Sequence, residues 1–405
     1  MDVLDDIEAA CVIYALYEEH ELSKKQQRNK IKRKYWVHPL NLKRPDSGQF
    51  QITFMTLRSY PEEFMKYYRM SIPSFDELIS LVRPKLSKQH TGLRVPISPE
   101  ERLTVTLRYL ATGTNFSALH FDFLMGVSTI GKIVRETCEV LWTILHPKEM
   151  VVPTMQDWLD IAEGFFSKTQ FPNCVGAVDG KHIRLECPPK SGTLYYNYKH
   201  FFSIILMAIC DANYCFTIID VGSYGKESDC NIFKKSSFGK KLYNGKVNFP
   251  QPQCLPEDDG GIPQPYVIVG DEAFALHKNL LRPFPGRSLN NERRIFNYRL
   301  SRARQNIECT FGILSNKWRV FHTALLVEPD FGVAITKACC VLHNFVRRRD
   351  GFYPEDTKTC DMEDVNQKIG VGNSTSVAKD VRDYFVDYFN QPTHELSWQN
   401  KVIGN

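Results

Sequence analysis

Three acidic residues, far apart in the chain, stand where a buried strand or a core helix ordinarily excludes a charge. Asp179 follows the apolar run in CVGAVDGKHI, Asp271 follows that in PYVIVGDEAF, and Glu308 lies within RARQNIECTFGIL. A carboxylate beside a core is costly unless a partner or a metal compensates it. Three that converge at one end of a sheet would form a hard-cation site of the kind that supports phosphodiester chemistry.

Each of these acids also has an ordinary structural explanation. Asp179 could belong to a turn with the glycine that follows it, and Asp271 could cap the helix after it. Glu308 follows Arg304 by four residues, which is the spacing of a helical ion pair. On the residues alone, a metal site and these explanations are about equally supported.

The sequence is less specific about the roles of other polar residues near the two aspartates. His182 and His277 are expected to be structural, with a supporting role toward a metal as the alternative. Asp229, in GSYGKESDCNIF, could be a fourth acid near the site, but we expect it to be a helix N-cap.

The elements that would position the acids form a mixed α/β pattern. Short apolar strands are expected at 175–178 and 267–269, so that Asp179 and Asp271 each follow the carboxyl end of a strand. Residues 203–210 form a continuous apolar run typical of a central strand, and Asp211-Ala212-Asn213 is a hairpin turn to the next strand. Long helices are expected at 290–318, which carries Glu308, and at 331–349. This order predicts a sheet flanked by helices.

The region before the first strand is predicted to be helical. Ser98-Pro99-Glu100-Glu101 begins one helix, and Ser74 with Glu77 forms a capping box for another. A short helix at 116–123, a break at Gly126 and a longer helix at 128–145 follow the helix-turn-helix pattern. The exposed face of the second helix would include Lys132 and Arg135. A plain three-helix bundle fits the same pattern equally well.

Composition and charge distribution narrow the class of protein. The 405 residues have a formal net charge of only +5, and the 12 cysteines include no C-x-x-C pair, which disfavours zinc and disulfides. No secretory signal or stretch long enough to cross a membrane is apparent, so we expect a reduced, intracellular chain. Residues 1–22 are acidic, and a basic burst follows. This burst is the candidate nuclear-import signal, formed by Lys24, Lys25, Arg28, Lys30, Lys32, Arg33 and Lys34.

Several motifs together resemble the PIF/Harbinger family of DDE transposases and their domesticated nuclease relatives. They are GAVDGKHI, GSYGKESD, VGDEAF, RARQNIECTFGILSNKWRVF and ACCVLHNFVRRRDG, with RKYWVHPLN, RMSIPSFDEL and RLTVTLRYLATG before them. The resemblance covers about residues 30–350. The 37 residues from Asp271 to Glu308 fit the family spacing, whereas Glu272-Ala273 departs from the Ser and Gly that more often follow the second Asp.

The resemblance implies an RNase H-like catalytic core in which Asp179, Asp271 and Glu308 are the catalytic, metal-binding acids. It implies a divalent metal, Mg²⁺ or alternatively Mn²⁺, for DNA cleavage at element ends and strand transfer by the freed 3′-hydroxyl. Lys181, Lys199, Lys317 and Arg319 would then contact DNA phosphates, alongside Lys132 and Arg135. It also implies double-stranded DNA as substrate, a Myb-like DNA-binding partner protein and nuclear localisation, or cytoplasmic localisation where import depends on the partner. A homodimer is an open alternative, and no membrane is involved.

These expectations divide the chain into four regions. Residues 1–36 are an acidic helix plus basic arm, and residues 37–165 are a helical, helix-turn-helix-like DNA-binding region. Residues 166–350 are an RNase H-like DDE endonuclease domain, and residues 351–405 are a polar, weakly ordered tail with one helix at 377–389. A non-catalytic DNA- or chromatin-binding adaptor derived from a transposase is the alternative function. Retention of all three acids favours the nuclease.

Overall fold

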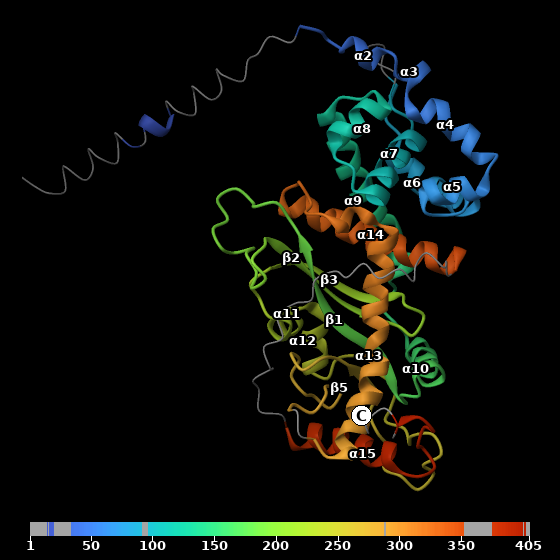
Figure 1. Ribbon diagram of the computed structural model, residues 1–405, viewed down its shortest axis with the longest axis vertical. Helices are drawn as coiled ribbons and strands as arrows, with labels where there is room; N and C mark the ends of the chain where they lie inside the picture. Colours follow the sequence, from blue (N-terminus) through green and yellow to red (C-terminus); the bar gives the residue numbers. More distant parts are fainter. Residues whose placement is uncertain are drawn as a thin grey trace, which may run out of the picture.

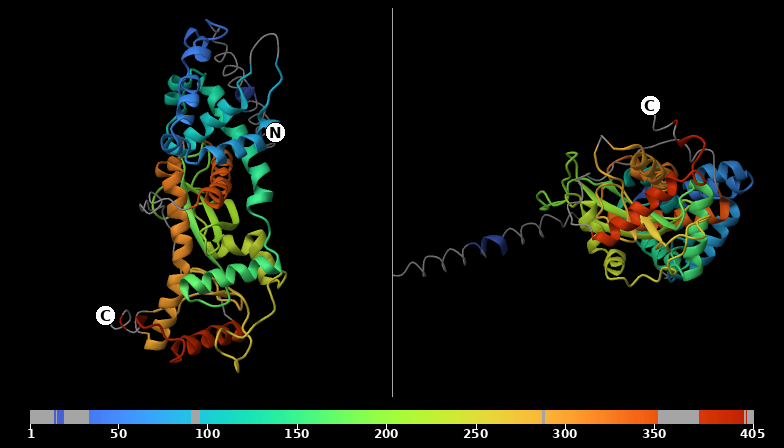
Figure 2. Two further views of the ribbon diagram at one scale, coloured as in Figure 1. Left: turned by 90° about the vertical axis from the view of Figure 1, so that its right-hand side faces the viewer. Right: turned by 90° about the horizontal axis from the view of Figure 1, so that it is seen from below.

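The computed structural model describes residues 14, 16–19, 34–90, 96–286, 289–351, 375–399 and 401. It is elongated, with helices α4 to α8 at one end, the sheet in the middle and helix α15 at the opposite end (Figure 1, Figure 2). Among the described residues, no helix combines the length and apolarity needed to cross a bilayer.

The described chain before the sheet consists mainly of helices. The helices are α2 (Pro39–Leu42), α3 (Arg44–Ser47), α4 (Gln49–Arg58), α5 (Pro61–Tyr68), α6 (Ile72–Leu86), α7 (Pro99–Thr112), α8 (Phe116–Phe123), α9 (Val127–Glu149) and α10 (Met155–Thr169). Ser98 caps α7 by accepting a hydrogen bond from the Glu101 backbone N–H. In α6 the cap is Ser71 rather than the expected Ser74, because helical geometry already begins at Ile72.

Five strands form one mixed sheet in the order β3-β2-β1-β4-β5. They are β1 (Cys174–Arg184), β2 (Ser203–Cys210), β3 (Phe216–Tyr224), β4 (Val267–Val269) and β5 (Leu280–Leu281). Strands β1, β2 and β3 pair antiparallel, whereas β4 runs parallel to β1 and to β5. All residues of β2 are buried, which confirms the central strand expected from its continuous apolar run.

Helices cover both faces of the sheet. The remaining helices are α11 (Asp229–Lys235), α12 (Ser237–Tyr243), α13 (Asn291–Lys317), the short 3-10 helix η1 (Arg319–His322), α14 (Pro329–Asp350) and α15 (Ser376–Asn390). One apolar core joins α13 and α14 to the face that carries Ala177 and Leu206. A second core joins α11, α12 and Trp158 of α10 to the opposite face, which carries Val178 and Met207. The long helix α13 therefore passes across the sheet beside β1 (Figure 1).

Among the described residues, the segment 323–329 pairs with the sheet only through an isolated bridge between Leu325 and Leu185. In the C-terminal tail, the helix expected at 377–389 is present as α15. Its Phe385 stacks on the buried Phe171, and its Phe389 meets the same ring edge to face. Aromatic side chains spaced four residues apart supply enough apolar surface to dock this helix.

Candidate metal centre

Asp179 lies within β1 rather than at its end. Its backbone pairs with Ala208 of β2, while the parallel pairing with β4 ends two residues earlier, at Ala177. The prediction that the strand stops at Val178 is therefore wrong, because β2 continues to pair with β1 as far as Arg184. Asp179 consequently lies beside the carboxyl end of β4, where the sheet opens on one side.

Asp271 lies where the sequence placed it, two residues after β4. Its Oδ1 accepts a hydrogen bond from the backbone N–H of Ala273, at 2.9 Å, which closes a tight turn. Gly270 permits this turn to pack closely, because a Cβ there would lie 2.8 Å from a ring carbon of Phe274. The turn directs the second acid toward the first.

A third carboxylate, that of Asp229, lies with these two acids. Asp229, at the start of α11, offers an oxygen that lies with oxygens of Asp179 and Asp271 in a group whose members are all within 4.8 Å of one another. All three residues are buried. The expected N-cap role for Asp229 is wrong, since Ser228 occupies the cap position and Asp229 is the first residue of the helix.

Burial and mutual repulsion disfavour the charged forms of the three acids. Burial raises the pKa of Asp179 to about 6, with the nearby Lys181 opposing and Asp271 reinforcing the rise. Burial also raises the pKa of Asp229 well above its ordinary value, and the charges of Asp179 and Asp271 add to that effect. The pKa of Asp271 is raised by burial against the opposing hydrogen bond from Ala273. A positive charge beside the three carboxylates would therefore stabilise their ionised forms.

Lys181 supplies part of that charge. Its Nζ lies 4.0 Å from Oδ2 of Asp179, and its ammonium lies 5.6 Å from the centre of the Phe311 ring. The side chain is itself buried. This placement makes Lys181 a neighbour of the acid cluster rather than a residue on an open surface.

Glu308 lies near the cluster but outside it. It projects from α13 with 42% of its side chain exposed, and its Oε1 is 2.5 Å from Nη2 of Arg304. Its charge nevertheless contributes to the raised pKa of Asp271, after burial and the effect of Glu272. The acid cluster of the structure therefore consists of Asp179, Asp229 and Asp271. Glu308 lies outside it and forms the helical ion pair with Arg304 that the sequence spacing allowed.

The other candidate DNA-binding residues are scattered. Lys132 is exposed on α9, whereas Arg135 lies 3.9 Å from Glu328 and stacks over Phe331 of α14. Arg319 is exposed at the start of η1, and Lys317 is buried at the end of α13.

Lys199 is described, whereas most of the proposed import signal and of the acidic N-terminal segment lies outside the described residues. Lys199 is half-buried in the β1–β2 loop, next to Tyr198. Of the proposed import signal only Lys34 is described, and it is exposed; Lys24, Lys25, Arg28, Lys30, Lys32 and Arg33 lie outside the described residues. The acidic segment is described only at residues 14 and 16–19, which are helical.

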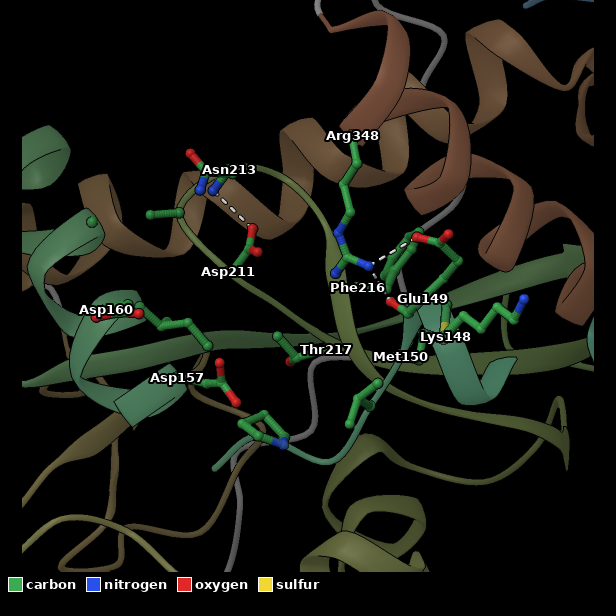
Figure 3. Close-up of a pocket in the computed structure, with 15 residues that line it drawn as sticks. Lys148, Glu149, Met150, Asp157, Asp160, Asp211, Asn213, Phe216, Thr217 and Arg348 are labelled. Carbon is green, nitrogen blue, oxygen red and sulfur yellow. Dashed lines mark hydrogen bonds and ion pairs between the residues drawn. The ribbon is translucent and has the colours of Figure 1, made fainter. Parts of the chain in front are cut away.

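A hollow of about 250 Å³ lies on another part of the molecule (Figure 3). It lies between the end of α9, α10, the hairpin turn after β2 and Arg348 of α14. Its acidic residues are already engaged: Asp211 accepts hydrogen bonds from Asn213 and Cys215, and Glu149 binds Arg348. None of the three clustered aspartates lines it, so the chemistry-bearing residues belong to the sheet opening and not to this hollow.

Comparisons with known proteins agree with the position of the acid cluster. Residues 178–344 match the model of the DDE superfamily endonucleases, a span that contains Asp179, Asp229, Asp271 and Glu308. No solved structure matches the chain.

Curated relatives match across most of the chain. Protein ALP1-like of Arabidopsis thaliana is 27% identical over 321 residues, covering 76% of each chain. The protein of the same plant named antagonist of like heterochromatin protein 1 is 26% identical, covering 82% of this chain and 87% of its own. HARBI1 of Rattus norvegicus, whose name marks it as a candidate nuclease, is 24% identical and covers 72% and 76%. Residues 178–344 are therefore similar to the DDE superfamily endonucleases, in agreement with the PIF/Harbinger motifs of the sequence.

Proposed function

We propose that this protein is a divalent-metal-dependent DNA endonuclease that uses Asp179, Asp271 and Glu308 as its catalytic acids. One observation carries the proposal. Within a DDE endonuclease domain, buried carboxylates converge beside the end of β4 and carry more negative charge than their protein neighbours offset. An arrangement that costs stability in the folded protein is typical of a functional site.

The fold supports this assignment. A mixed sheet of order β3-β2-β1-β4-β5, with three antiparallel strands followed by two parallel ones and helices on both faces, corresponds to an RNase H-like core. The first acid lies on the central strand β1 and the second follows the neighbouring strand β4. The long helix α13 then brings Glu308 past the same edge.

The residues present fit a hard divalent cation. Both carboxylate oxygens of Asp229 are buried and have no hydrogen-bond partner, so the cluster contains ligand atoms that the protein itself does not satisfy. All-oxygen donors of this kind suit Mg²⁺ or Mn²⁺. A bound cation of this class would activate the attacking hydroxyl and stabilise the charge of the leaving oxygen.

The protein's own residues have distinct tasks in this proposal. Asp179 and Asp271 would hold the cation, and Lys181 beside Asp179 limits the negative charge. Glu308 is paired with Arg304, and it would become a further ligand if a nucleic acid phosphate replaced it beside the guanidinium. Exposed Lys132 and Arg319, with Lys199 in the β1–β2 loop, are proposed phosphate contacts that fix the position of the DNA backbone.

The proposal extends to a partner protein and to the location of this protein in the cell. From the family resemblance we propose a Myb-like DNA-binding partner and nuclear localisation, and a homodimer stays an open alternative. An alternative function is a non-catalytic chromatin adaptor. The observation in its favour is the relative whose name describes antagonism of like heterochromatin protein 1, which matches over 82% of this chain.

Nicking of a supercoiled plasmid by the purified full-length protein tests the proposal. Mg²⁺ or Mn²⁺ should convert supercoiled DNA to the nicked form, and EDTA should prevent it. Asp271→Ala should abolish nicking and leave DNA binding nearly intact, because phosphate contacts dominate affinity. Nicking by pure Asp271→Ala protein would refute the metal model. DNA binding by a wild-type protein that never nicks would favour the adaptor.

A further inference from the structure

We propose that Asp229 is a direct carboxylate ligand of the catalytic cation, so that the site comprises four acids rather than three. The inference deepens the proposed function and rests on it. The sequence left this role as the alternative and favoured a helix N-cap, because an Asp just before a helix is the usual pattern of a cap.

The position of Asp229 excludes the ordinary capping role. Ser228 has the extended backbone of an N-cap residue, with φ −90° and ψ 151°, and Asp229 follows it inside α11. Its side chain makes no hydrogen bond with any backbone N–H, because neither carboxylate oxygen has a hydrogen-bond partner. A side chain that accepts no hydrogen bond from a backbone N–H group does not cap the helix.

The burial of Asp229 is difficult to explain without a ligand. The residue is 1% exposed, so water compensates its carboxylate poorly, and an unpaired buried charge costs several kcal/mol. The charges of Asp179 and Asp271 repel its carboxylate. Lys181 attracts it, but this attraction is weaker than the repulsion and the cost of burial together. The three acids thus converge with their oxygens within 4.8 Å of one another. A divalent cation at the centre of that group removes the repulsion and supplies the missing partner.

Glu308 differs from Asp229 in its exposure and in its pairing, which supports Asp229 as the resident ligand. Glu308 is partly exposed and already has a partner in Arg304, whereas Asp229 is buried and has none through its carboxylate oxygens. We infer that Asp179, Asp229 and Asp271 form the resident cation site of the protein without DNA. Glu308 completes the site only when the substrate is bound.

Metal binding to the full-length protein, measured without DNA, tests this assignment directly. The probe is Mn²⁺ alone, added to EDTA-treated protein and followed by calorimetric titration and by the rise in melting temperature. Asp229→Asn should weaken Mn²⁺ binding at least about tenfold, because it removes a charged ligand and keeps the side-chain volume. Glu308→Gln should weaken it far less, since Glu308 lies outside the cluster.

Two further variants serve as controls for the Mn²⁺ titration. Asp220→Asn changes a half-buried carboxylate on β3 that is not part of the cluster, and it should bind Mn²⁺ as the wild type does. Asp271→Asn should lose binding. Wild-type affinity in Asp229→Asn, together with loss in Asp271→Asn, would overturn the role of Asp229 and leave the proposed function intact.

Other outcomes distinguish failure of the Asp229 assignment from failure of the proposed function. If the wild type and Asp271→Asn bind Mn²⁺ equally, or neither binds it, the proposed function fails together with this inference. Circular dichroism and the melting temperature in EDTA establish that each variant is folded. Should Asp229→Asn not fold, Asp229→Ser repeats the titration with a smaller uncharged side chain, and wild-type Mn²⁺ affinity in it would again overturn the assignment.

Discussion

Arg304 and Glu308 form an ion pair one helical turn apart on α13, with Nη2 of Arg304 2.5 Å from Oε1 of Glu308. The acid that the family resemblance made a metal ligand is therefore engaged by a neighbouring cation. Burial raises the pKa of Asp179 and of Asp271, and the charge of Arg304 opposes that rise in both. One guanidinium thus influences three of the four acids.

Replacing Glu308 should separate catalysis from stability. Glu308→Gln removes a partly exposed helical pair, so the free energy of unfolding should change by less than about 1 kcal/mol. Metal-dependent nicking should fall about 100-fold or more, because a metal ligand is lost at the moment of cleavage. Urea unfolding and plasmid nicking measure the two effects. A loss of several kcal/mol in stability would indicate that Glu308 is structural.

Glu149 should be a strong stabilising contact between α9 and α14. Its buried carboxylate lies 2.9 Å from Nη1 of Arg348 and 2.9 Å from Nη1 of Arg349. Glu149→Gln should cost about 2–4 kcal/mol, because it leaves two guanidinium groups without a buried partner. Glu77→Gln is the matched control, since half-exposed Glu77 binds the same Arg349 and should cost less than about 1 kcal/mol. Equal costs in urea unfolding would contradict this ranking.

His343 should make stability dependent on pH below neutrality. Burial lowers its pKa to about 3, with the hydrogen bond to the Tyr214 carbonyl opposing and the charges of Arg347 and Lys317 reinforcing the shift. The unfolded chain takes up the proton near pH 6.5 and the folded chain does not. Stability from this residue is therefore complete above pH 6.5 and is lost as pH falls toward 3, at up to about 1.4 kcal/mol per pH unit.

The measurement is the slope of unfolding free energy against pH. His343→Gln keeps a donor for Tyr214 but does not titrate, so its slope between pH 6.5 and 4.5 should be shallower than that of the wild type. Identical slopes for the two proteins would show that His343 does not titrate differently in the folded and unfolded chains.

Arg299 should link the C-terminal helix to the chain around the sheet. This buried side chain donates to the Gln170 carbonyl at 2.9 Å and to Gln399 at 3.3 Å, and it stacks over Phe389 of α15. Arg299→Met removes those hydrogen bonds, so we expect a loss of about 2–4 kcal/mol and faster proteolysis after residue 351. Limited proteolysis of the variant beside the wild type detects release of α15. Equal protection would mean that the aromatic contacts alone hold the helix.

Lys132 and Arg135 should behave differently, although the sequence places them on the same face. Exposed Lys132→Ala should weaken DNA binding similarly for all sequences and reduce the salt dependence by about one charge. Arg135→Ala should instead reduce stability by about 1 kcal/mol, since this side chain packs on Phe331 and lies near Glu328. Fluorescence anisotropy at several salt concentrations and urea unfolding distinguish them. A larger loss of DNA binding with Arg135→Ala would reverse the roles.

Local sequence determined much of the scaffold. The apolar run at 203–210 could only be stable as a strand covered on both faces, and it forms the buried β2. Pro99 after Ser98 indicated a helix start that the structure reproduces in α7. Asp271 was placed correctly because a three-residue apolar strand and a glycine set its position within a few residues. These features depend on neighbours in the chain, which a sequence displays directly.

Tertiary structure alone decided which acids meet. Asp179 lies inside β1 because β2 continues to pair beyond the end of β4, and strand pairing across more than twenty residues is not visible in a local pattern. Asp229 has the local signature of a helix cap, and only the packing of α11 against the sheet turns its carboxylate toward Asp179 and Asp271. The spacing of Arg304 and Glu308 allowed either an ion pair or a metal ligand. Repulsion and burial act through space between segments distant in sequence, so the composition of the cluster follows from the fold and not from any single motif.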